Sequence, residues 1–377
     1  MHRMLLEPHR VGRILLIATR QIGDVLLVTP LLASLRRAYP ESVIDVLVFR
    51  GTAGILEGNP HLTGVLEVSE RPSRQEYRDL LSRIFRRYDL AVSTLAGDRP
   101  HLFGLLAARH RIGLVYERDW RSAWKRWSNT RWAWLDDVQT HTVSQNLALA
   151  DLLGIERLTE LIPPNAALPP HFQADALRQS GVAAYAVLHL NPMWTYKRWT
   201  AAGWRAVIDA LLAKRMHVFI SGGPRDAAES AEMADAFAAG VTSLAGRLSF
   251  GQLARLISGA RLFIGPDTAV THLAAATGVP TLAIYGPSNP IKWGPWPKGY
   301  AGPDSPWRSL ARPWQRQHNV LLLQGEDPVG RPACVPCHGE GCDRHKKSLS
   351  VCLQSLEVDR VQSAVASLLL ESPPSHG

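Results

Sequence analysis

The sequence of 377 residues lacks the features that mark several large classes of protein. It contains no run of about 18 apolar residues, so a membrane-spanning helix is not expected. The first residues hold no apolar core of the kind that a secretion signal requires. Four cysteines in a chain of this length do not resemble the dense disulfide framework of small secreted proteins, which favours a reducing cytoplasm.

The chain also has little that suits nucleic acid, since no zinc-finger, helix-turn-helix or RNA-recognition signature is present. The dinucleotide fingerprint of three spaced glycines is missing, and so is the Gly-Lys-Ser/Thr of a P-loop. What the sequence does have is an excess of positive charge, +9 at pH 7. This charge predicts anionic partners, and without the signatures of nucleic-acid binding it favours phosphorylated sugars or an anionic membrane surface.

Short apolar runs alternate with helical patterns, an order typical of parallel sheets covered by helices. A strand over residues 13–18 is followed by a helix over 25–38 and a strand over 43–49. Residues 161–170 hold four prolines and form the best linker, after which a second α/β run begins. We therefore predict two Rossmann-like domains, with a cleft between them that suits a two-substrate reaction.

The stretch over residues 261–287 predicts a buried strand, a loop, a helix over 268–277 and a second buried strand. Asp267 is the expected N-cap of that helix, and Gly278 is its expected C-cap. Ligands bind at the carboxyl ends of strands in open α/β sheets, and unpaired N–H groups in a first helical turn suit phosphate. The stretch therefore predicts either a phosphate or nucleotide site or an ordinary capped crossover helix.

Residues 116–134 depart from the α/β alternation, because tryptophans near one helical face are interleaved with basic residues. Such a segment can lie at a membrane interface, stack on sugar rings, or pack on its own domain with the arginines in solvent. The candidates for acceptor or membrane contact are Trp120, Trp124, Arg121 and Lys125.

The four cysteines lie near the end of the chain in C-x2-C-x4-C-x9-C spacing. A CxxC pair with two further cysteines can bind zinc, but the second half lacks the usual close pair. Buried reduced thiols and adventitious disulfides are the alternatives, so no metal is assigned. A structural metal site is kept as an option for Cys334, Cys337, Cys342 and Cys352.

Three segments of the chain together resemble glycosyltransferase family 9, the heptosyltransferases of lipopolysaccharide core assembly. They are RILLIATRQIGDVLLVTPLLASLRRAYP, GPDTAVTHLAAATGVPTLAIYGPSNPIKWGP, and CVPCHGEGC with SVCLQSLEVDRV. The resemblance covers nearly the whole chain and implies a GT-B fold. It implies an acceptor-binding domain over 1–162, a linker over 163–170, a donor-binding domain over 171–355, and over 356–377 a helix that packs back towards the first domain.

The resemblance also implies an inverting, metal-independent transfer of heptose from ADP-heptose to a lipopolysaccharide core or a related lipid-linked anionic saccharide. The enzyme is then expected at the cytoplasmic face of the inner membrane, as a peripheral protein. The nucleotide sugar is a substrate, so no cofactor is expected. Two alternatives stay open, which are a GT-B-shaped nucleotide-sugar epimerase and a non-catalytic saccharide- or membrane-binding scaffold.

Asp24 matches the position of the family's catalytic base. Inverting transfer needs a base that deprotonates the acceptor hydroxyl as this hydroxyl attacks the anomeric carbon. A carboxylate in the loop after the first strand would face the cleft. Asp24 can also serve as the N-cap of a helix that starts at Val25, and the two roles are compatible.

The family's donor site maps onto the second half of the chain. Departure of a nucleoside diphosphate leaves negative charge, which cations and N–H groups stabilise. The matching positions are Thr195, Lys197, Asp226, Asp267, Thr268, Ala269 and His272. Lys197 matches the lysine that binds the donor phosphate, and Asp226 is the candidate for the nucleotide ribose. Ala269 stands where the family usually has glycine, and its methyl group can crowd the phosphate or stiffen the turn. This departure bears on ADP-heptose specificity more than on the GT-B fold.

Overall fold

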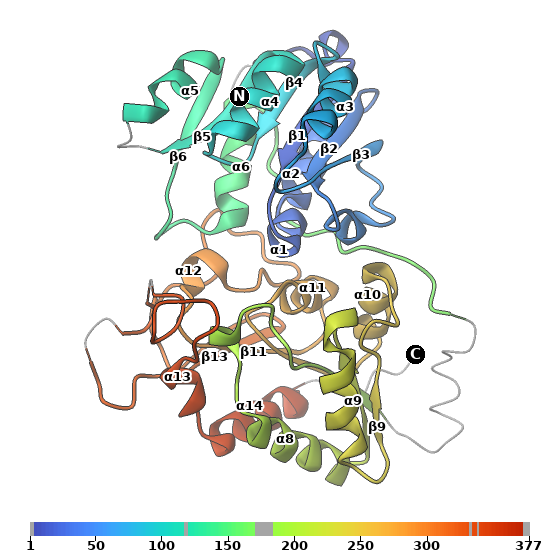
Figure 1. Ribbon diagram of the computed structural model, residues 1–377, viewed down its shortest axis with the longest axis vertical. Coiled ribbons are helices and arrows are strands. Elements are labelled where there is room, and N and C mark those ends of the chain that lie inside the picture. The colour runs from blue at the N-terminus through green and yellow to red at the C-terminus, as the bar shows by residue number, and fades with distance from the viewer. Residues whose placement is uncertain (1–3, 117–119, 170–183, 332–333, 338, 372–377) are drawn as a thin grey trace. The chain divides into compact units, whose positions relative to one another are not determined.

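The computed structural model describes residues 4–116, 120–169, 184–331, 334–337 and 339–371. The chain forms two compact units, one of residues 1–164 with 301–305 and one of residues 165–300 with 306–377. Each unit is a sheet of mostly parallel strands with helices packed on it (Figure 1), which confirms the predicted α/β class with two Rossmann-like domains. The last linker residue, Pro170, and residues 171–183 of the predicted donor domain lie outside the described residues.

The first unit contains a parallel sheet in the order β3-β2-β1-β4-β5-β6. Its strands are β1 (Arg13–Ala18), β2 (Val43–Phe49), β3 (Gly64–Val68), β4 (Tyr88–Ser93), β5 (Ala108–Tyr116) and β6 (Arg131–Leu135). Its α-helices are α1 (Ile22–Leu26), α2 (Thr29–Ala38), α3 (Arg74–Ile84), α4 (Asp98–Ala107), α5 (Ala123–Ser128) and α6 (Thr142–Leu153). The order reverses at β1 and β4, which pair with Ile14 opposite Leu90. Ligands bind at such a switch point in open α/β sheets.

The helix predicted over residues 25–38 is two helices, α1 and α2, separated at Leu27 and Val28. Pro30 lies in the first turn of α2, where its missing N–H costs no hydrogen bond, and this favours a new helix start. Asp24 lies within the first turn of α1, whose N-cap is Gln21. The prediction that Asp24 caps a helix starting at Val25 is therefore wrong.

The second unit contains a sheet in the order β12-β13-β11-β10-β7-β8-β9, parallel except for the antiparallel pair β12 and β13. Its strands are β7 (Ala184–His189), β8 (Met216–Ser221), β9 (Val241–Ser243), β10 (Leu262–Pro266), β11 (Thr281–Tyr285), β12 (Trp314–Gln317) and β13 (Val320–Gln324). Its α-helices are α8 (Ala201–Ala213), α9 (Ala227–Asp235), α10 (Phe250–Ser258), α11 (Ala269–Thr277), α12 (Pro290–Trp293), α13 (Val351–Gln354) and α14 (Val358–Glu371). No helix among the described residues is long and apolar enough to cross a membrane.

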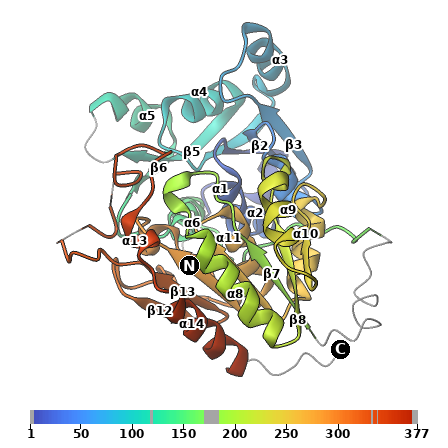
Figure 2. The same cartoon turned by 60° about the horizontal axis from the view of Figure 1, so that its bottom comes forward.

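The C-terminal helix α14 lies beside α8 (Figure 2) and contacts β11 and β13 of the same sheet. Val361, Val365 and Leu368 are buried in the core of the second unit. The apolar face of α14 is buried by its own unit, where it packs on α8 and the sheet. The helix that the resemblance implies, one packing back towards the first domain, stays a prediction.

A pair of leucines on α14 tests this packing. Leu368→Ala should lower the free energy of unfolding of the second unit by about 2–5 kcal/mol, because it leaves a cavity in the core. Leu370→Ala, the same chemical change at a side chain that is 85% exposed, should lower it by less than about 0.5 kcal/mol. Urea denaturation of both variants measures the difference, and equal losses would contradict the burial of Leu368.

Candidate active site

The N-cap of α11, the helix that follows β10, lies one residue later than the sequence predicts. Thr268, and not Asp267, is the N-cap of α11, and its side chain accepts a hydrogen bond from the Thr271 N–H. The Thr271 hydroxyl in turn donates to the Pro266 carbonyl, 2.5 Å away. This local arrangement leaves the Asp267 carboxylate available for partners from other elements.

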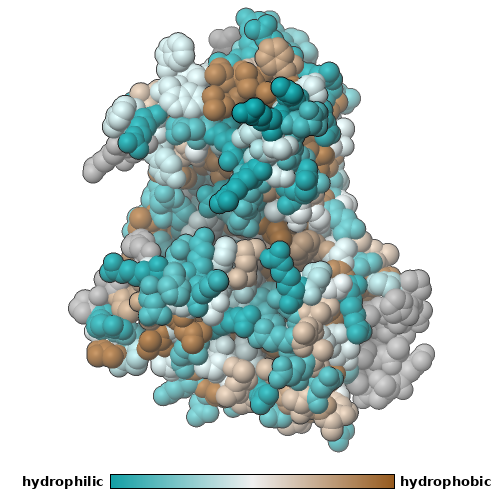
Figure 3. Space-filling model, viewed as in Figure 1, coloured by the Kyte–Doolittle hydropathy of each residue, from teal (hydrophilic) through white to brown (hydrophobic). Residues whose placement is uncertain are grey.

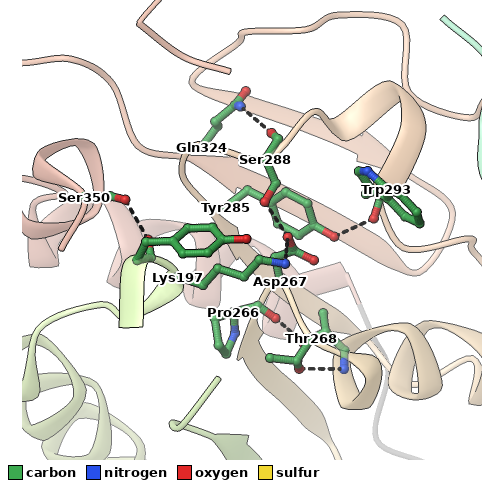
Figure 4. Close-up of polar contacts among 11 residues, drawn as sticks. Lys197, Pro266, Asp267, Thr268, Tyr285, Ser288, Trp293, Gln324 and Ser350 are labelled. Carbon is green, nitrogen blue, oxygen red and sulfur yellow. Dashed lines mark hydrogen bonds and ion pairs between the residues drawn. The ribbon is translucent and has the colours of Figure 1, made fainter. Parts of the chain in front are cut away.

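The Asp267 carboxylate is buried and forms an ion pair with Lys197, whose Nζ lies 2.6 Å from Oδ2. The Ser288 hydroxyl donates to the same carboxylate (Figure 4). Burial raises the pKa of Asp267, but the charge of Lys197 and the hydrogen bonds from Lys197 and Ser288 outweigh it and hold the pKa below its usual value. Asp267 is therefore ionised at neutral pH although water scarcely reaches it.

Two further residues belong to this cluster, Ser288 and Tyr285, and neither was predicted from the sequence. The Tyr285 hydroxyl donates to the Trp293 carbonyl at 2.7 Å, and burial together with the charge of Asp267 raises the Tyr285 pKa well above its usual value. Both residues lie at the end of β11 or just after it, and β11 pairs with β10. Their position at the carboxyl edge of a neighbouring strand was the signal in the sequence that would have found them.

His272 lies on α11 and is almost completely buried, at 4% exposed. Burial lowers its pKa to about 4, with the charge of Asp267 opposing this shift and that of Lys197 adding to it. The imidazole is therefore neutral at pH 7. Its Nδ1 has no hydrogen-bond partner among the described residues, which makes it a buried polar atom without satisfied hydrogen bonding.

The other predicted donor residues follow the carboxyl ends of neighbouring strands. Thr195 and Lys197 share one 3₁₀ turn after β7, and Asp226 ends another after β8. The Asp226 carboxylate accepts a hydrogen bond from the Gly223 N–H at 2.7 Å, so it closes its own turn. Ala269 is the first residue of α11, where a helical backbone suits alanine. Because β8, β7 and β10 are adjacent, the structure brings these residues to one edge of the sheet.

Asp24 follows β1 at the carboxyl edge of the first unit's sheet, beside the switch point with β4. Its Oδ1 lies 3.4 Å from the Nε of Arg20, and its side chain is 18% exposed. The carboxylate is therefore held by a cation while part of it stays accessible to a reactant.

The basic tryptophan segment does not form one helical face, because Trp134 lies on β6 while Trp124 lies on α5. The prediction that Lys125 forms a surface contact to an acceptor or a membrane is also wrong, since this residue is only 4% exposed. Its ammonium donates to the Ala96 carbonyl at 2.7 Å and forms an ion pair with Asp98 at 3.0 Å. Burial of a lysine requires such partners, and these two come from the loop after β4 and the start of α4.

Three tryptophans of this segment lie on the surface. Trp120 is 79% exposed, Trp127 is 87% exposed and Trp134 is 38% exposed. The Arg121 guanidinium lies 5.6 Å from the centre of the Trp120 ring, within the range of a cation–π contact. Trp124 is half-buried, with its ring edge-on to that of His101. Residues of intermediate and hydrophilic character cover α5 at the upper left of Figure 3.

All four cysteines are free thiols. Burial and the neighbouring cysteines raise the pKa of Cys352 to about 12, so this thiol is protonated at neutral pH. The described part of the chain contains no group of three or more His, Cys, Asp or Glu side chains arranged to hold a metal ion.

The chain is similar to a known family of enzymes. The family model of glycosyltransferase family 9 (heptosyltransferase) matches residues 100–326. Lipopolysaccharide heptosyltransferase 3 of Escherichia coli is 31% identical over 319 residues, which cover 80% of this chain and 92% of that protein. Lipopolysaccharide heptosyltransferase 1 of Pseudomonas aeruginosa is 28% identical, over 84% of this chain and 93% of that protein.

Solved structures show the same fold. The glycosyltransferase family 9 protein from Veillonella parvula superposes with a TM-score of 0.75 at 21% identity, covering 98% of this chain and all of that one. The E. coli heptosyltransferase WaaC with ADP-2-deoxy-2-fluoro heptose gives a TM-score of 0.65 at 20% identity, covering 94% of this chain and 99% of that chain. The chain belongs to glycosyltransferase family 9, the heptosyltransferases, and has their GT-B fold.

Proposed function

We propose that this protein transfers heptose from ADP-heptose to a lipopolysaccharide core or a related lipid-linked saccharide, with inversion and without a metal ion. Membership of the family and the lipopolysaccharide heptosyltransferases among its relatives support a glycosyltransferase acting on lipopolysaccharide. The observation that carries the proposal is the Lys197–Asp267 ion pair at the start of α11.

The donor diphosphate binds where Lys197 and the first turn of α11 meet. The first N–H groups of a helix and its dipole favour an anion, and an ammonium group adds a full positive charge. His272, neutral and with one unsatisfied nitrogen, is a further group that can hydrogen-bond a phosphate oxygen. A structural neighbour described with ADP-2-deoxy-2-fluoro heptose supports this class of donor.

Asp24 is the base of the reaction. Its carboxylate takes the proton of the acceptor hydroxyl while the acceptor oxygen forms a bond to the anomeric carbon. The bond from that carbon to the pyrophosphate oxygen breaks on the opposite face, so the configuration inverts. Lys197 and the N–H groups of α11 stabilise the negative charge that develops on the departing diphosphate, which is the electrostatic contribution that the proposal requires.

The protein works at the cytoplasmic face of the inner membrane, bound peripherally. Its net charge of +9 attracts it to anionic lipid or to a phosphorylated saccharide core. The exposed rings of Trp120 and Trp127, with Arg121 beside the first, have the amphipathic character that suits the boundary between headgroups and acyl chains.

A direct assay separates transfer from the alternatives. The protein is incubated with a panel of nucleotide sugars, with and without deacylated core acceptor, and released diphosphate and product mass are measured. Acceptor-dependent release from ADP-heptose supports the proposal. Conversion of the sugar without acceptor would indicate an epimerase, and nucleotide binding without turnover would indicate a scaffold.

The first prediction from this mechanism concerns Asp24. Asp24→Ala should lower kcat by at least about 100-fold, because the acceptor hydroxyl loses its general base. The Kd for ADP should stay unchanged, since the base does not touch the nucleotide. Asp79→Ala, which removes an exposed acid on α3 of the same unit, is the control and should keep full activity. Unimpaired turnover in Asp24→Ala would remove Asp24 from the mechanism.

A second prediction concerns Lys197. Lys197→Ala should weaken ADP binding by about tenfold or more, because a charge-assisted contact to phosphate is lost. The same change leaves the buried Asp267 carboxylate unpaired, which destabilises the fold. The double variant Lys197→Ala/Asp267→Asn removes that second effect and should still bind ADP weakly. Wild-type affinity in the double variant, measured by calorimetry, would count against the phosphate role.

A third prediction concerns the exposed tryptophans. Trp120→Ala/Trp127→Ala should reduce binding to vesicles that contain phosphatidylglycerol, because two interfacial anchors are lost. Phe85→Ala is the matched control, as it removes a 51% exposed ring elsewhere on the same unit. Sedimentation with vesicles gives the bound fraction. Equal binding by the wild type and the tryptophan variant would argue that these rings do not contact lipid.

A further inference from the structure

A pocket in the second unit lies outside all the groups assigned to the reaction. It has a volume of about 430 Å³ and is formed by the loop before β12 and by β12 itself. Three arginines line it, Arg308, Arg312 and Arg316, together with Trp314. None of these lining residues is acidic, so the lining of the pocket is positively charged.

The charges of the pocket are available to a ligand. Arg308 and Arg312 are both exposed. Within the described residues, neither guanidinium forms an ion pair with an acidic side chain. Trp314 is 61% exposed, so its ring offers a flat surface beside these cations.

The loop that carries the arginines is held in place by two buried glutamines. The Gln315 side chain accepts from the Ser309 N–H at 3.1 Å and donates to the Ser309 carbonyl at 3.0 Å. The Gln324 side chain, 1% exposed, accepts from the Arg312 N–H at 3.3 Å. The backbone positions of the arginines are therefore fixed before any ligand arrives, which lowers the entropic cost of binding.

The same Gln324 also reaches the loop after β11. Its Nε2 donates to the Gly286 carbonyl at 3.3 Å. It also donates to the Ser288 carbonyl at 3.4 Å (Figure 4). Ser288 is the residue whose hydroxyl binds Asp267. One side chain thus fixes both the arginine loop and the loop that holds the Asp267–Lys197 pair.

We propose that this pocket binds a phosphate group, presented by a soluble saccharide or by a lipid headgroup. Guanidinium groups form paired hydrogen bonds to phosphate oxygens, and arginine is preferred where that geometry matters. The Trp314 ring supplies a face on which a sugar ring can pack. Such a phosphate can come from a soluble phosphosaccharide or from a lipid headgroup, and both present the same oxygens. None of the lining residues belongs to the site proposed for the donor. The proposed acceptor is a phosphorylated saccharide, so a saccharide ligand in this pocket would rest on the proposed function.

The test compares the full-length wild type with Arg308→Gln/Arg312→Gln. Binding of a soluble bisphosphorylated disaccharide is measured by calorimetry, and binding to phosphatidylglycerol vesicles by sedimentation. The double variant should lose about tenfold or more in affinity for one of these two probes, since two charge-assisted contacts disappear. Loss for the disaccharide identifies a soluble saccharide phosphate as the ligand, and loss for vesicles alone identifies a lipid headgroup.

Two controls make the result specific. Arg205→Gln removes an exposed arginine from α8 of the same unit and should leave both affinities unchanged. The Kd for ADP should also be unchanged in the double variant, which keeps this result distinct from any failure of the proposed donor site. Unaltered binding of both probes by the double variant overturns the proposal, and so does an equal loss in Arg205→Gln.

Discussion

The ion pair between Lys197 and the buried carboxylate of Asp267 is the constraint on which the second unit's site depends. A carboxylate that is 7% exposed keeps its charge only when cations and hydrogen-bond donors replace the lost water. Lys197 supplies the charge, and Ser288 supplies a hydrogen bond. Lys197, Asp267 and Ser288 therefore join three separate segments, the turn after β7, the loop after β10 and the loop after β11. The ion pair positions a lysine at the start of α11 before any ligand binds.

The charge states around this pair follow from the same burial. His272 and Tyr285 are both buried, and burial favours the neutral form of each side chain. Burial therefore lowers the pKa of His272 and raises the pKa of Tyr285. At neutral pH the cluster holds one cation and one anion, with neutral groups around them. In the proposed donor site, a diphosphate would compete with Asp267 for Lys197 and would gain the N–H groups of α11 in return. Binding as proposed would then be an exchange of partners for Lys197 and not the filling of an empty cationic site.

Much of this arrangement could be predicted from local sequence patterns. The parts that could not be predicted depend on contacts between residues far apart in the sequence. The β10–α11–β11 order, the C-cap at Gly278 and the position of Lys197 after β7 could be predicted, because apolar periodicity and turn residues are local signals. The N-cap was misplaced by one residue because Asp267 finds a better partner in Lys197, far away in sequence. Lys125 was expected on the surface because its neighbours are basic. Its burial depends on a carbonyl and a carboxylate near residue 97, which no pattern within residues 116–134 encodes.

Gln324 links the cluster around Asp267 to the loop that carries Arg312. A buried amide that bonds to Arg312 on one side and to Gly286 and Ser288 on the other leaves neither loop free to shift alone, because a broken hydrogen bond in the interior leaves an unsatisfied polar group. The arginine pocket and the Asp267–Lys197 pair therefore share one support at the end of β13. If a bound phosphate displaced the loop of Arg312, the position of Ser288 would change first. The Ser288 hydroxyl would pass this change to the Asp267 carboxylate, which holds Lys197. The fold thus supplies a short, fully hydrogen-bonded connection between two places where phosphate chemistry is expected.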